Sequence, residues 1–275
     1  MSVNIQRAYG RAFDQLRDIR ISYNVFGYAP GSVLFELGDT KVLCSVTMQI
    51  GVPPFLKGTK TGWLTAEYAM LPTSCQTRAT RESSQAKRND RSVEISRLIG
   101  RSLRAVVDLK RIGERTIYVD CDVLQADGST RTAAITGAFL ALKKADAHWL
   151  NAGDILESTI IDAVAAVSAG MTENGPLLDL DYAEDSIIEA DYNFILTQSE
   201  KIVEIQGAAE KNALTWQQFE QLKNLAIKGT SDLFARMNLD TQKIPLVKPA
   251  NNSDTKKQRT DAPLFSLKNR FVKAV

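Results

Sequence analysis

The chain has 275 residues, of which 44% are hydrophobic and 24% charged, and its formal net charge is only +2. The length allows one large domain or two small ones, and the composition is typical of a soluble globular protein with a core of normal size. No segment approaches the roughly 18 consecutive apolar residues that a membrane span needs, so we expect no contact with a membrane.

Cysteine and histidine are too few for several kinds of site. Cys44, Cys75 and Cys121 are scattered and form no C-x-x-C pair, which argues against a disulfide framework and against a zinc site. The first residues, MSVNIQRAYGRAF, lack the apolar core of a signal peptide, so we expect a reducing, cytoplasmic location. The single histidine, His148, ends a helical pattern and is expected on the surface, which leaves Asp, Glu, Arg, Lys or bound ions for any chemistry.

The chain up to residue 90 is predicted to contain one β-hairpin and two loops. Residues 32–37 and 41–48 are rich in Val, Leu and Thr, and the Gly-Asp-Thr sequence between them predicts a turn. Residues 51–65 contain several prolines and glycines and are interpreted as a loop. Residues 73–90 include several basic residues and almost nothing apolar, so we expect an exposed loop there.

Two helices and a strand are predicted in the middle of the chain. Asp90 is the expected N-cap of the first helix, which puts Arg91 in the first turn. The apolar face of this helix is formed by residues at helical spacing: Val93, Leu98, Ile99, Leu103, Val106 and Val107. A strand over residues 116–124 and a turn at Asp127-Gly128 lead into a second helix over residues 129–144.

The second half of the chain is predicted to contain more strands and a last helix. An amphipathic helix over residues 216–237 is preceded by four strands: residues 163–171, 177–180, 191–197 and 202–205. This mixture of helices and hairpin-type strands indicates an α+β fold. We place one domain over residues 1–240 and expect residues 241–275 to form a basic, disordered tail. Residues 243–275 contain eight Lys or Arg and two Asp, which gives this segment a charge of +6. The rest of the chain therefore has a charge of −4.

The starts of the two central helices are candidate phosphate sites. The sequence Gly128-Ser129-Thr130-Arg131 begins the second helix, where free backbone N–H groups and a partial positive charge favour an anion. Ser129 and Thr130 add hydroxyl donors, and Arg131 adds a guanidinium group that matches phosphate oxygens. Arg91 lies at the start of the first helix, beside the basic loop. An ordinary helix cap and a solvated arginine are the alternative interpretations.

An acidic run is the third candidate site. Six carboxylates fall within thirteen residues: Asp179, Asp181, Glu184, Asp185, Glu189 and Asp191. They repel one another unless cations or arginines neutralise them, and carboxylates bind Mg²⁺ while leaving room for substrate phosphates. An exposed acidic turn is the alternative. Together with the two helix starts, the run indicates phosphoryl chemistry on a polyanion.

The same segments resemble the ribonuclease PH family of phosphorolytic 3′→5′ exoribonucleases, which are tRNA nucleotidyltransferases. The similarity covers residues 10–238 and is close in five stretches: GSVLFELGDTKVLCSVT, GWLTAEYAMLP, EISRLIGRSLRAVVDLKRIGERTIYVDCDVLQADGSTRTAAITGAF, LLDLDYAEDSIIEADYN and VEIQGAAE. The series RLIGR, VDCDVLQADG and TRTAAITG separates this family from larger relatives, polynucleotide phosphorylase and the exosome ring subunits.

The resemblance implies a ribonuclease PH fold of two similar β–α halves and a homohexamer, a trimer of dimers. The implied reaction trims the 3′ end of tRNA precursors with inorganic phosphate as co-substrate and releases nucleoside 5′-diphosphates, with Mg²⁺ as cofactor. The family's site residues match these positions: for phosphate, Arg91, Ser129, Thr130 and Arg131; for catalysis and the metal, Asp185 and Asp191; for RNA, Arg78 and Arg81.

Some positions depart from the family pattern: Asp18 replaces a usual Pro, Thr73 an Arg, Ser129 a Gly, Tyr192 a Met, and Ala208 a small hydroxyl residue. Thr73 removes a phosphate contact and predicts weaker RNA binding. Ser129 keeps its backbone N–H but is expected to place a side chain beside the phosphate. Two alternatives to phosphorolysis remain, a catalytically silent RNA-binding ring subunit and a metal-dependent hydrolytic nuclease. Retention of Arg91, Arg131, Asp185 and Asp191 argues against the silent subunit.

Overall fold

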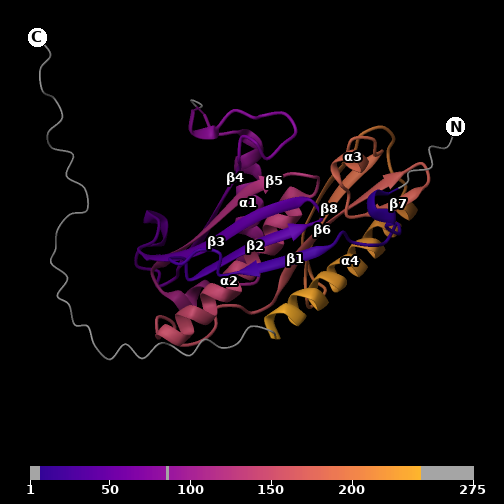
Figure 1. The fold of residues 1–275 in the computed structure, drawn as a ribbon. Coiled ribbons are helices and arrows are strands. Elements are labelled where there is room, and N and C mark those ends of the chain that lie inside the picture. Colours follow the sequence, from indigo (N-terminus) through magenta and orange to yellow (C-terminus); the bar gives the residue numbers. More distant parts are fainter. Residues whose placement is uncertain (1–6, 85–86, 243–275) are drawn as a thin grey trace, which may run out of the picture. The chain divides into compact units, whose positions relative to one another are not determined.

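The computed structural model describes residues 7–84 and 87–242 (Figure 1). The chain divides into two compact units, Met1–Gln242 and Lys243–Val275, and the second lies outside the described residues. The prediction of a disordered basic tail therefore falls almost entirely on residues that the structure does not describe. Within the described part, no helix is long and apolar enough to cross a membrane.

Five strands of the described chain form the first sheet, in the order β1-β2-β3-β5-β4. They are β1 (Ile19–Tyr23), β2 (Gly31–Leu37), β3 (Thr40–Ile50), β4 (Trp63–Met70) and β5 (Arg115–Gln125). Neighbouring strands are antiparallel except β4 and β5, which are parallel. The predicted hairpin is confirmed as β2–β3, and the strand predicted over residues 116–124 is confirmed as β5.

Strands β1 and β4 are absent from the prediction. Strand β1 lies at the sheet edge and is only half-buried, so its alternation of apolar and polar residues is short. The predicted loop over residues 51–65 is wrong at its end, because β4 begins at Trp63. Gly62 marks the change, since a Cβ there would lie 2.3 Å from the Ile112 side chain. The glycine that suggested a loop is instead required for close packing where the strand begins.

Four strands of the described chain form the second sheet, in the order β7-β6-β8-β9. They are β6 (Val164–Thr172), β7 (Gly175–Leu178), β8 (Ala190–Thr197) and β9 (Ile202–Ala209), and all neighbours are antiparallel. Each of them matches a predicted strand. Strand β9, however, continues four residues beyond its predicted end at residue 205.

Helix α2 (Thr130–Ala152) lies between the two sheets, with β2 and β3 on one side and β6 on the other (Figure 1). It extends eight residues beyond the predicted end at residue 144, because Lys143 and Lys144 interrupt an apolar pattern that Ala145 and Trp149 resume as buried residues. His148 is exposed on this helix, as predicted. The position of α2 brings its first turn to the line where the sheets meet.

Two further long helices cover the sheets. Helix α1 (Asp90–Arg104) packs on β4 and α2, and α4 (Trp216–Gln242) runs along β6, β7 and β8 (Figure 1). The predicted N-cap of α1 at Asp90 is wrong by one residue. The Asn89 side chain accepts a hydrogen bond of 2.9 Å from the Arg91 N–H, which leaves Asp90 in the first turn.

Three arginines near the N-terminus neutralise part of the acidic run. Arg7 donates hydrogen bonds of 2.7 and 3.1 Å to the two carboxylate oxygens of Glu184, and Arg17 donates bonds of 3.0 and 2.7 Å to those of Asp179. Arg11 lies 3.2 Å from Glu184. Each of these five residues is less than 9% exposed, so the ion pairs tie the N-terminal segment to the turn after β7 inside the protein.

The expectation of a single acidic cluster is therefore corrected. Burial alone would raise the pKa of Asp179 and of Glu184, but the charges and hydrogen bonds of Arg17 and Arg7 lower both pKa values below the ordinary range. These carboxylates are ionised structural groups rather than ligands for a cation. A sequence pattern could not show this division, because the neutralising arginines lie more than 150 residues away in the chain.

Glu184 also fixes the short helix α3 (Tyr182–Asp185). Asp181 is its N-cap, and the side chains of Asp181 and Glu184 bond to each other's backbone N–H in a capping box. The next residue along the chain is Asp185, which was predicted to be catalytic. The buried ion pairs thus hold the backbone that carries a predicted site residue.

The Arg17→Ala substitution would leave Asp179 buried and charged without its main partner, so we expect the free energy of unfolding to fall by about 3–5 kcal/mol at neutral pH. Because the pKa of Asp179 is lowered in the folded state, its ion pair stabilises the protein above about pH 4 and is lost as the pH falls below that value. The difference between variant and parent should therefore shrink in acid. Urea titrations across this pH range measure both effects.

The pair of the exposed Arg20 with the partly buried Glu36, 3.7 Å apart, supplies the control for this prediction. Arg20→Ala should change the free energy of unfolding by less than about 1 kcal/mol. A loss in Arg17→Ala as small as that in the control would contradict the structural role of the buried network.

Candidate active site

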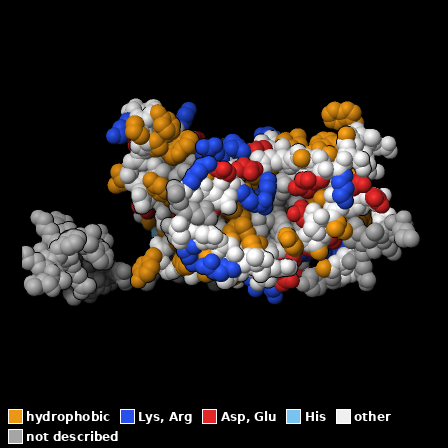
Figure 2. Space-filling model, turned by 90° about the horizontal axis from the view of Figure 1, so that it is seen from above, with side chains coloured by type: hydrophobic (Ala, Val, Ile, Leu, Met, Phe, Trp, Pro, Cys, Tyr) orange, Lys and Arg blue, Asp and Glu red, His pale blue; other side chains and the backbone are white. Residues whose placement is uncertain are grey.

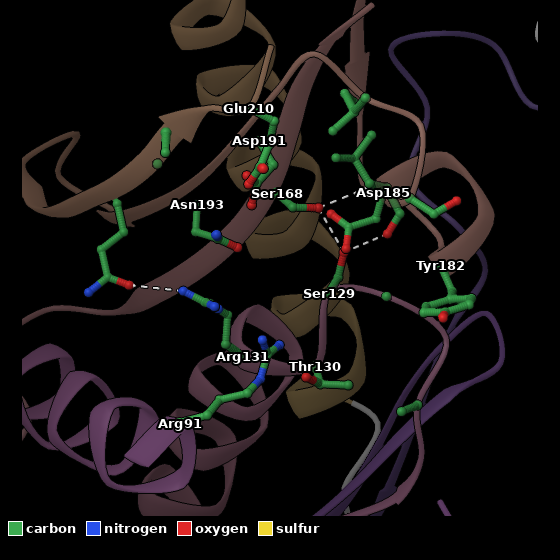
Figure 3. A pocket seen from close by; sticks show the side chains of 18 of the residues that line it. Arg91, Ser129, Thr130, Arg131, Ser168, Tyr182, Asp185, Asp191, Asn193 and Glu210 are labelled. Carbon is green, nitrogen blue, oxygen red and sulfur yellow. Dashed lines mark hydrogen bonds between the residues drawn. The ribbon is translucent and has the colours of Figure 1, made fainter. Parts of the chain in front are cut away.

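A cavity of about 1120 Å³ lies where the second sheet meets the starts of α1 and α2. Its lining includes every predicted phosphate-binding residue and both predicted catalytic aspartates: Arg91, Ser129, Thr130, Arg131, Asp185 and Asp191. These side chains come from four separate elements and converge on one space (Figure 3). On the face seen in Figure 2, basic and acidic side chains likewise lie close to one another.

The predicted RNA-binding residues Arg78 and Arg81 do not line this cavity. They are exposed on the loop that precedes α1, as predicted. The same loop nevertheless reaches the cavity, because residues 75–77 form part of its lining. An RNA that enters the cavity could therefore contact the two arginines outside it.

The start of α2 is held at the cavity by close backbone packing. Gly128 has a φ of 73°, and a Cβ there would lie 2.5 Å from the carbonyl oxygen of Leu180. Ser129, the N-cap of α2, also has a positive φ, 54°, which is unfavourable by about 1–2 kcal/mol for a residue with a side chain. Glycine, the usual family residue at position 129, would adopt this conformation without strain.

The hydroxyl of Ser129 offsets this strain with hydrogen bonds. It donates a bond of 2.8 Å to the carbonyl oxygen of Leu180 and lies 2.7 Å from the hydroxyl of Ser168, which in turn accepts a bond of 3.0 Å from the Leu180 N–H. The Ser129 side chain therefore joins α2 to β6 and to the turn after β7. Its hydroxyl is thus engaged with the protein, and because Ser129 also lines the cavity, its contact with phosphate stays a prediction.

Thr130 and the two arginines complete the basic side of the cavity. The Thr130 hydroxyl accepts a bond of 3.0 Å from the buried Tyr68 hydroxyl and keeps its own proton for another acceptor. Arg131 is held by Gln206, at 3.2 Å, while the exposed Arg91 extends towards it (Figure 3). Two guanidinium groups beside the positive end of a helix form an anion-binding site.

The orientation of the Arg131 side chain is also fixed by a carboxylate, that of Glu94. The Arg131 Nη1 atom lies 3.6 Å from Oε1 of Glu94, and the Arg131 side chain is only 19% exposed. In the described chain, the ion pair with Glu94 and the hydrogen bond to Gln206 both involve this one nitrogen. The geometry therefore orients the group while leaving its other N–H donors for a ligand.

Asp185 and Asp191 form the acidic side of the cavity. Burial raises the pKa of Asp185, and the charges of Asp191 and Glu210 raise it further, although Arg91 and Arg131 lower it. Within residues 7–84 and 87–242 no hydrogen bond or ion pair reaches either aspartate side chain. These two carboxylates thus differ from Asp179 and Glu184, because no arginine in the described chain forms an ion pair with them.

The oxygen donors of Asp185 and Asp191 fit Mg²⁺, which prefers one or two carboxylates together with water and substrate oxygens. The described residues contain no group of three or more His, Cys, Asp or Glu side chains that could hold a metal by themselves. A metal at this pair would therefore depend on the substrate and on water for most of its ligands.

Two of the departures from the family pattern, Tyr192 and Ala208, flank Asp191 in the second sheet. Tyr192 packs away from the cavity, with its ring 5.7 Å from that of Phe219 in α4. The replacement of Met by Tyr there alters the packing behind Asp191. Ala208 lines the cavity and lies opposite Asp191 in the β8–β9 register, so the missing hydroxyl removes a polar group beside this carboxylate. Thr73 is exposed outside the lining.

Several polar lining residues were not predicted: Ser168, Tyr182, Asn193, Gln206 and Glu210. Asn193 could have been found, because it lies two residues after Asp191 on a strand and therefore faces the same side. Gln206 and Glu210 were missed because the last strand was predicted to end too early. The remaining two carry no local sequence signal.

The chain is similar to known proteins over most of its length. A profile described as "3' exoribonuclease family, domain 1" matches residues 15–148, and its "domain 2" matches residues 162–229. Ribonuclease PH of Neisseria meningitidis serogroup C is 52% identical over 223 residues, which cover 81% of this chain and 92% of that protein. The Neisseria gonorrhoeae ribonuclease PH has the same identity and coverage.

Solved structures show the same fold at lower identity. An Archaeoglobus fulgidus exosome chain, solved with RNA bound to the active site, superposes with a TM-score of 0.71 at 24% identity and covers 84% of this chain and 92% of its own. A chain of an archaeal exosome core superposes with a TM-score of 0.67 at 24% identity, with 83% and 90% covered. The matches to both domain profiles and to relatives at 52% identity show that the chain belongs to the 3′ exoribonuclease family.

Proposed function

We propose that the protein is a phosphorolytic 3′→5′ exoribonuclease that trims the 3′ ends of tRNA precursors. The observation that carries the proposal is the single cavity in which Arg91, Arg131 and the start of α2 face Asp185 and Asp191. Phosphorolysis requires that a free phosphate approach an RNA phosphate, and two anions meet only where positive charge holds them. The name and the identity of the curated relatives support the same reaction.

In this reaction an oxygen of inorganic phosphate attacks the last phosphodiester of the RNA. The bond from phosphorus to the 3′-oxygen of the preceding nucleotide breaks, that oxygen gains a proton, and a nucleoside 5′-diphosphate leaves. Arg91, Arg131, Thr130 and the amides of α2 bind and neutralise the attacking phosphate. Asp185 and Asp191 lie on the leaving-group side, where a carboxylate can deliver the proton.

Mg²⁺ bound by Asp185 and Asp191 would stabilise the negative charge that develops on the phosphoryl oxygens. Because the pKa of Asp185 is raised, its carboxyl is protonated more readily than that of an ordinary aspartate. This supports a role in delivering the proton to the leaving oxygen. A cation at the pair would favour the ionised form instead. The protein's own contribution is to hold the two carboxylates together and opposite the arginines.

RNA outside the cavity is the proposed ligand of Arg78 and Arg81, and a homohexamer built from three dimers is the proposed assembly. The exposure of both arginines, on a loop whose residues 75–77 line the cavity, supports the first proposal. The second rests on the family resemblance. The free cysteines of the described chain are consistent with the predicted cytoplasmic location, and the division into a domain over residues 1–240 and a basic tail over 241–275 stays a prediction.

Incubation of RNA with and without inorganic phosphate tests the proposed reaction. We expect shortening of the RNA only with phosphate, and nucleoside diphosphates as the products. In the reverse direction, nucleoside diphosphates should extend an RNA 3′ end. Monophosphates released without phosphate would establish a hydrolytic nuclease instead, and RNA binding without any product would establish a silent subunit.

Substitutions on the two sides of the cavity should have different effects. Arg131→Ala removes charged hydrogen bonds to phosphate and should raise the KM for phosphate by about tenfold or more. Asp191→Asn removes a charge that acts on the leaving group and should lower kcat by about 100-fold while RNA affinity is nearly unchanged. Steady-state kinetics with phosphate and RNA varied separately measure both.

Exposed residues outside the cavity provide matched controls for these variants: Arg20→Ala and Asp232→Asn. Both should behave as the parent. If Asp191→Asn kept the parent's kcat, or if Arg131→Ala left the KM for phosphate unchanged, the assignment of that side of the cavity would be wrong.

Arg78→Ala combined with Arg81→Ala should weaken cleavage of tRNA precursors much more than phosphate exchange on a short oligonucleotide, because only the longer RNA reaches the loop. Each lost phosphate contact should also reduce the slope of log affinity against log salt by about one. Lys57→Ala with Lys110→Ala removes the same charge from exposed positions elsewhere and should change neither. Equal losses on long and short RNA would show that the two arginines act on the cavity or on folding.

A further inference from the structure

Three polar residues lie side by side on the cavity face of the second sheet. Asn193 in β8 is opposite Ser168 in β6 and opposite Gln206 in β9. All three line the cavity. The two outer residues are engaged with the protein, since Ser168 lies 2.7 Å from the Ser129 hydroxyl and Gln206 accepts a hydrogen bond of 3.2 Å from Arg131.

The middle residue differs from its neighbours. Asn193 is only 6% exposed, yet in the described part of the chain no hydrogen bond reaches its side-chain amide. The amide atoms of Asn193 are not among the enclosed side-chain atoms of the described chain that lack a hydrogen-bond partner, so they keep access to the cavity. The cavity is the one direction left for the amide, and Figure 3 shows it in the space between Arg131 and Asp191. The amide therefore has its hydrogen-bonding capacity available to a ligand in the cavity.

The neighbours of Asn193 define which part of a ligand it meets. On one side lie Arg131 and the start of α2, where the proposed function puts the attacking phosphate. On the other side, two residues earlier on the same face of β8, lies Asp191, on the leaving-group side. The phosphorus under attack must lie between these two groups, because attacking and leaving oxygens are roughly in line through it.

An asparagine suits this position for an electrostatic reason. Its NH₂ group donates hydrogen bonds without adding a charge, so it can contact a phosphate oxygen without neutralising the nearby carboxylates. The non-bridging oxygens project sideways from the line of attack and gain charge as the reaction proceeds. A donor fixed in the wall of the cavity stabilises that charge without having to reorganise.

We propose that the Asn193 amide donates a hydrogen bond to a non-bridging oxygen of the RNA phosphodiester under attack. The inference rests on the proposed phosphorolysis and adds a neutral contact to its charged ones. Asn193 thereby becomes a third group that touches the reacting phosphate, between the arginines and the aspartates.

Sulfur substitution at the scissile phosphate tests this contact. RNAs whose terminal linkage carries sulfur at one or the other non-bridging position should differ in rate with the parent protein, because sulfur is a poor hydrogen-bond acceptor. Asn193→Ala should lower kcat on normal RNA by about 10- to 100-fold. In this variant the slowing by sulfur at the contacted position should largely disappear, while the slowing at the other position stays.

Two further variants separate the contact from folding. Asn193→Asp keeps the size of the side chain but replaces the donor by an acceptor, so it should lose at least as much kcat as Asn193→Ala. Asn151→Ala, at an exposed position on α2, should match the parent in kcat and in both sulfur effects. Thermal unfolding of all variants shows whether the protein remains folded.

The outcomes distinguish this inference from the reaction on which it rests. If the parent is phosphorolytic but Asn193→Ala retains both sulfur effects unchanged, the inference is wrong and the proposed function stands. The same conclusion follows if Asn193→Ala instead loses its discrimination between a 2′-hydroxyl and a 2′-deoxy terminal nucleotide, because the amide then binds the sugar. Phosphate-independent release of monophosphates by the parent would overturn the proposed function itself.

Discussion

Six carboxylates within thirteen residues cannot fold together unless positive charge is brought to some of them, and this constraint organises the active side of the molecule. Arg7 and Arg17 enter from the N-terminal segment and bind Glu184 and Asp179 through paired hydrogen bonds. Of the other four carboxylates, Asp185 and Asp191 line the cavity and form no ion pair with an arginine in the described chain. A buried structural network and a free carboxylate pair are thus built from one stretch of sequence.

The cavity also requires that the start of α2 lie close to strand β8, which comes from the other half of the chain. Helix α2 satisfies this requirement because it is buried between the two sheets, so its first turn opens where they join. Gly128 allows the backbones to approach, and the Ser129 hydroxyl bridges the remaining gap to Leu180 and Ser168. The strained backbone of Ser129 is therefore compatible with the fold, because its side chain supplies contacts that a glycine would lack.

Local patterns in the sequence were sufficient for most of the fold and for the charged residues of the site. The helical spacing from Val93 predicted α1, and each strand of the second sheet matches a predicted strand. Patterns failed where tertiary contacts decide the outcome: β1 is short and at an edge, and α2 continues past two lysines because its later residues are buried. The role proposed for Asn193 could not be read from sequence either, since only packing shows that its buried amide makes no hydrogen bond within residues 7–84 and 87–242.

The proposed reaction requires that an inorganic anion bind between Arg91, Arg131 and the start of α2, opposite the two aspartates. A crystal structure of the protein soaked with tungstate, a heavy analogue of phosphate, tests this requirement directly through anomalous scattering. We predict one strong peak within hydrogen-bond distance of both guanidinium groups and of the first amides of α2, displaced by added phosphate and absent from Arg131→Ala crystals. Tungstate bound elsewhere while this site stays empty at saturating concentration would contradict the account.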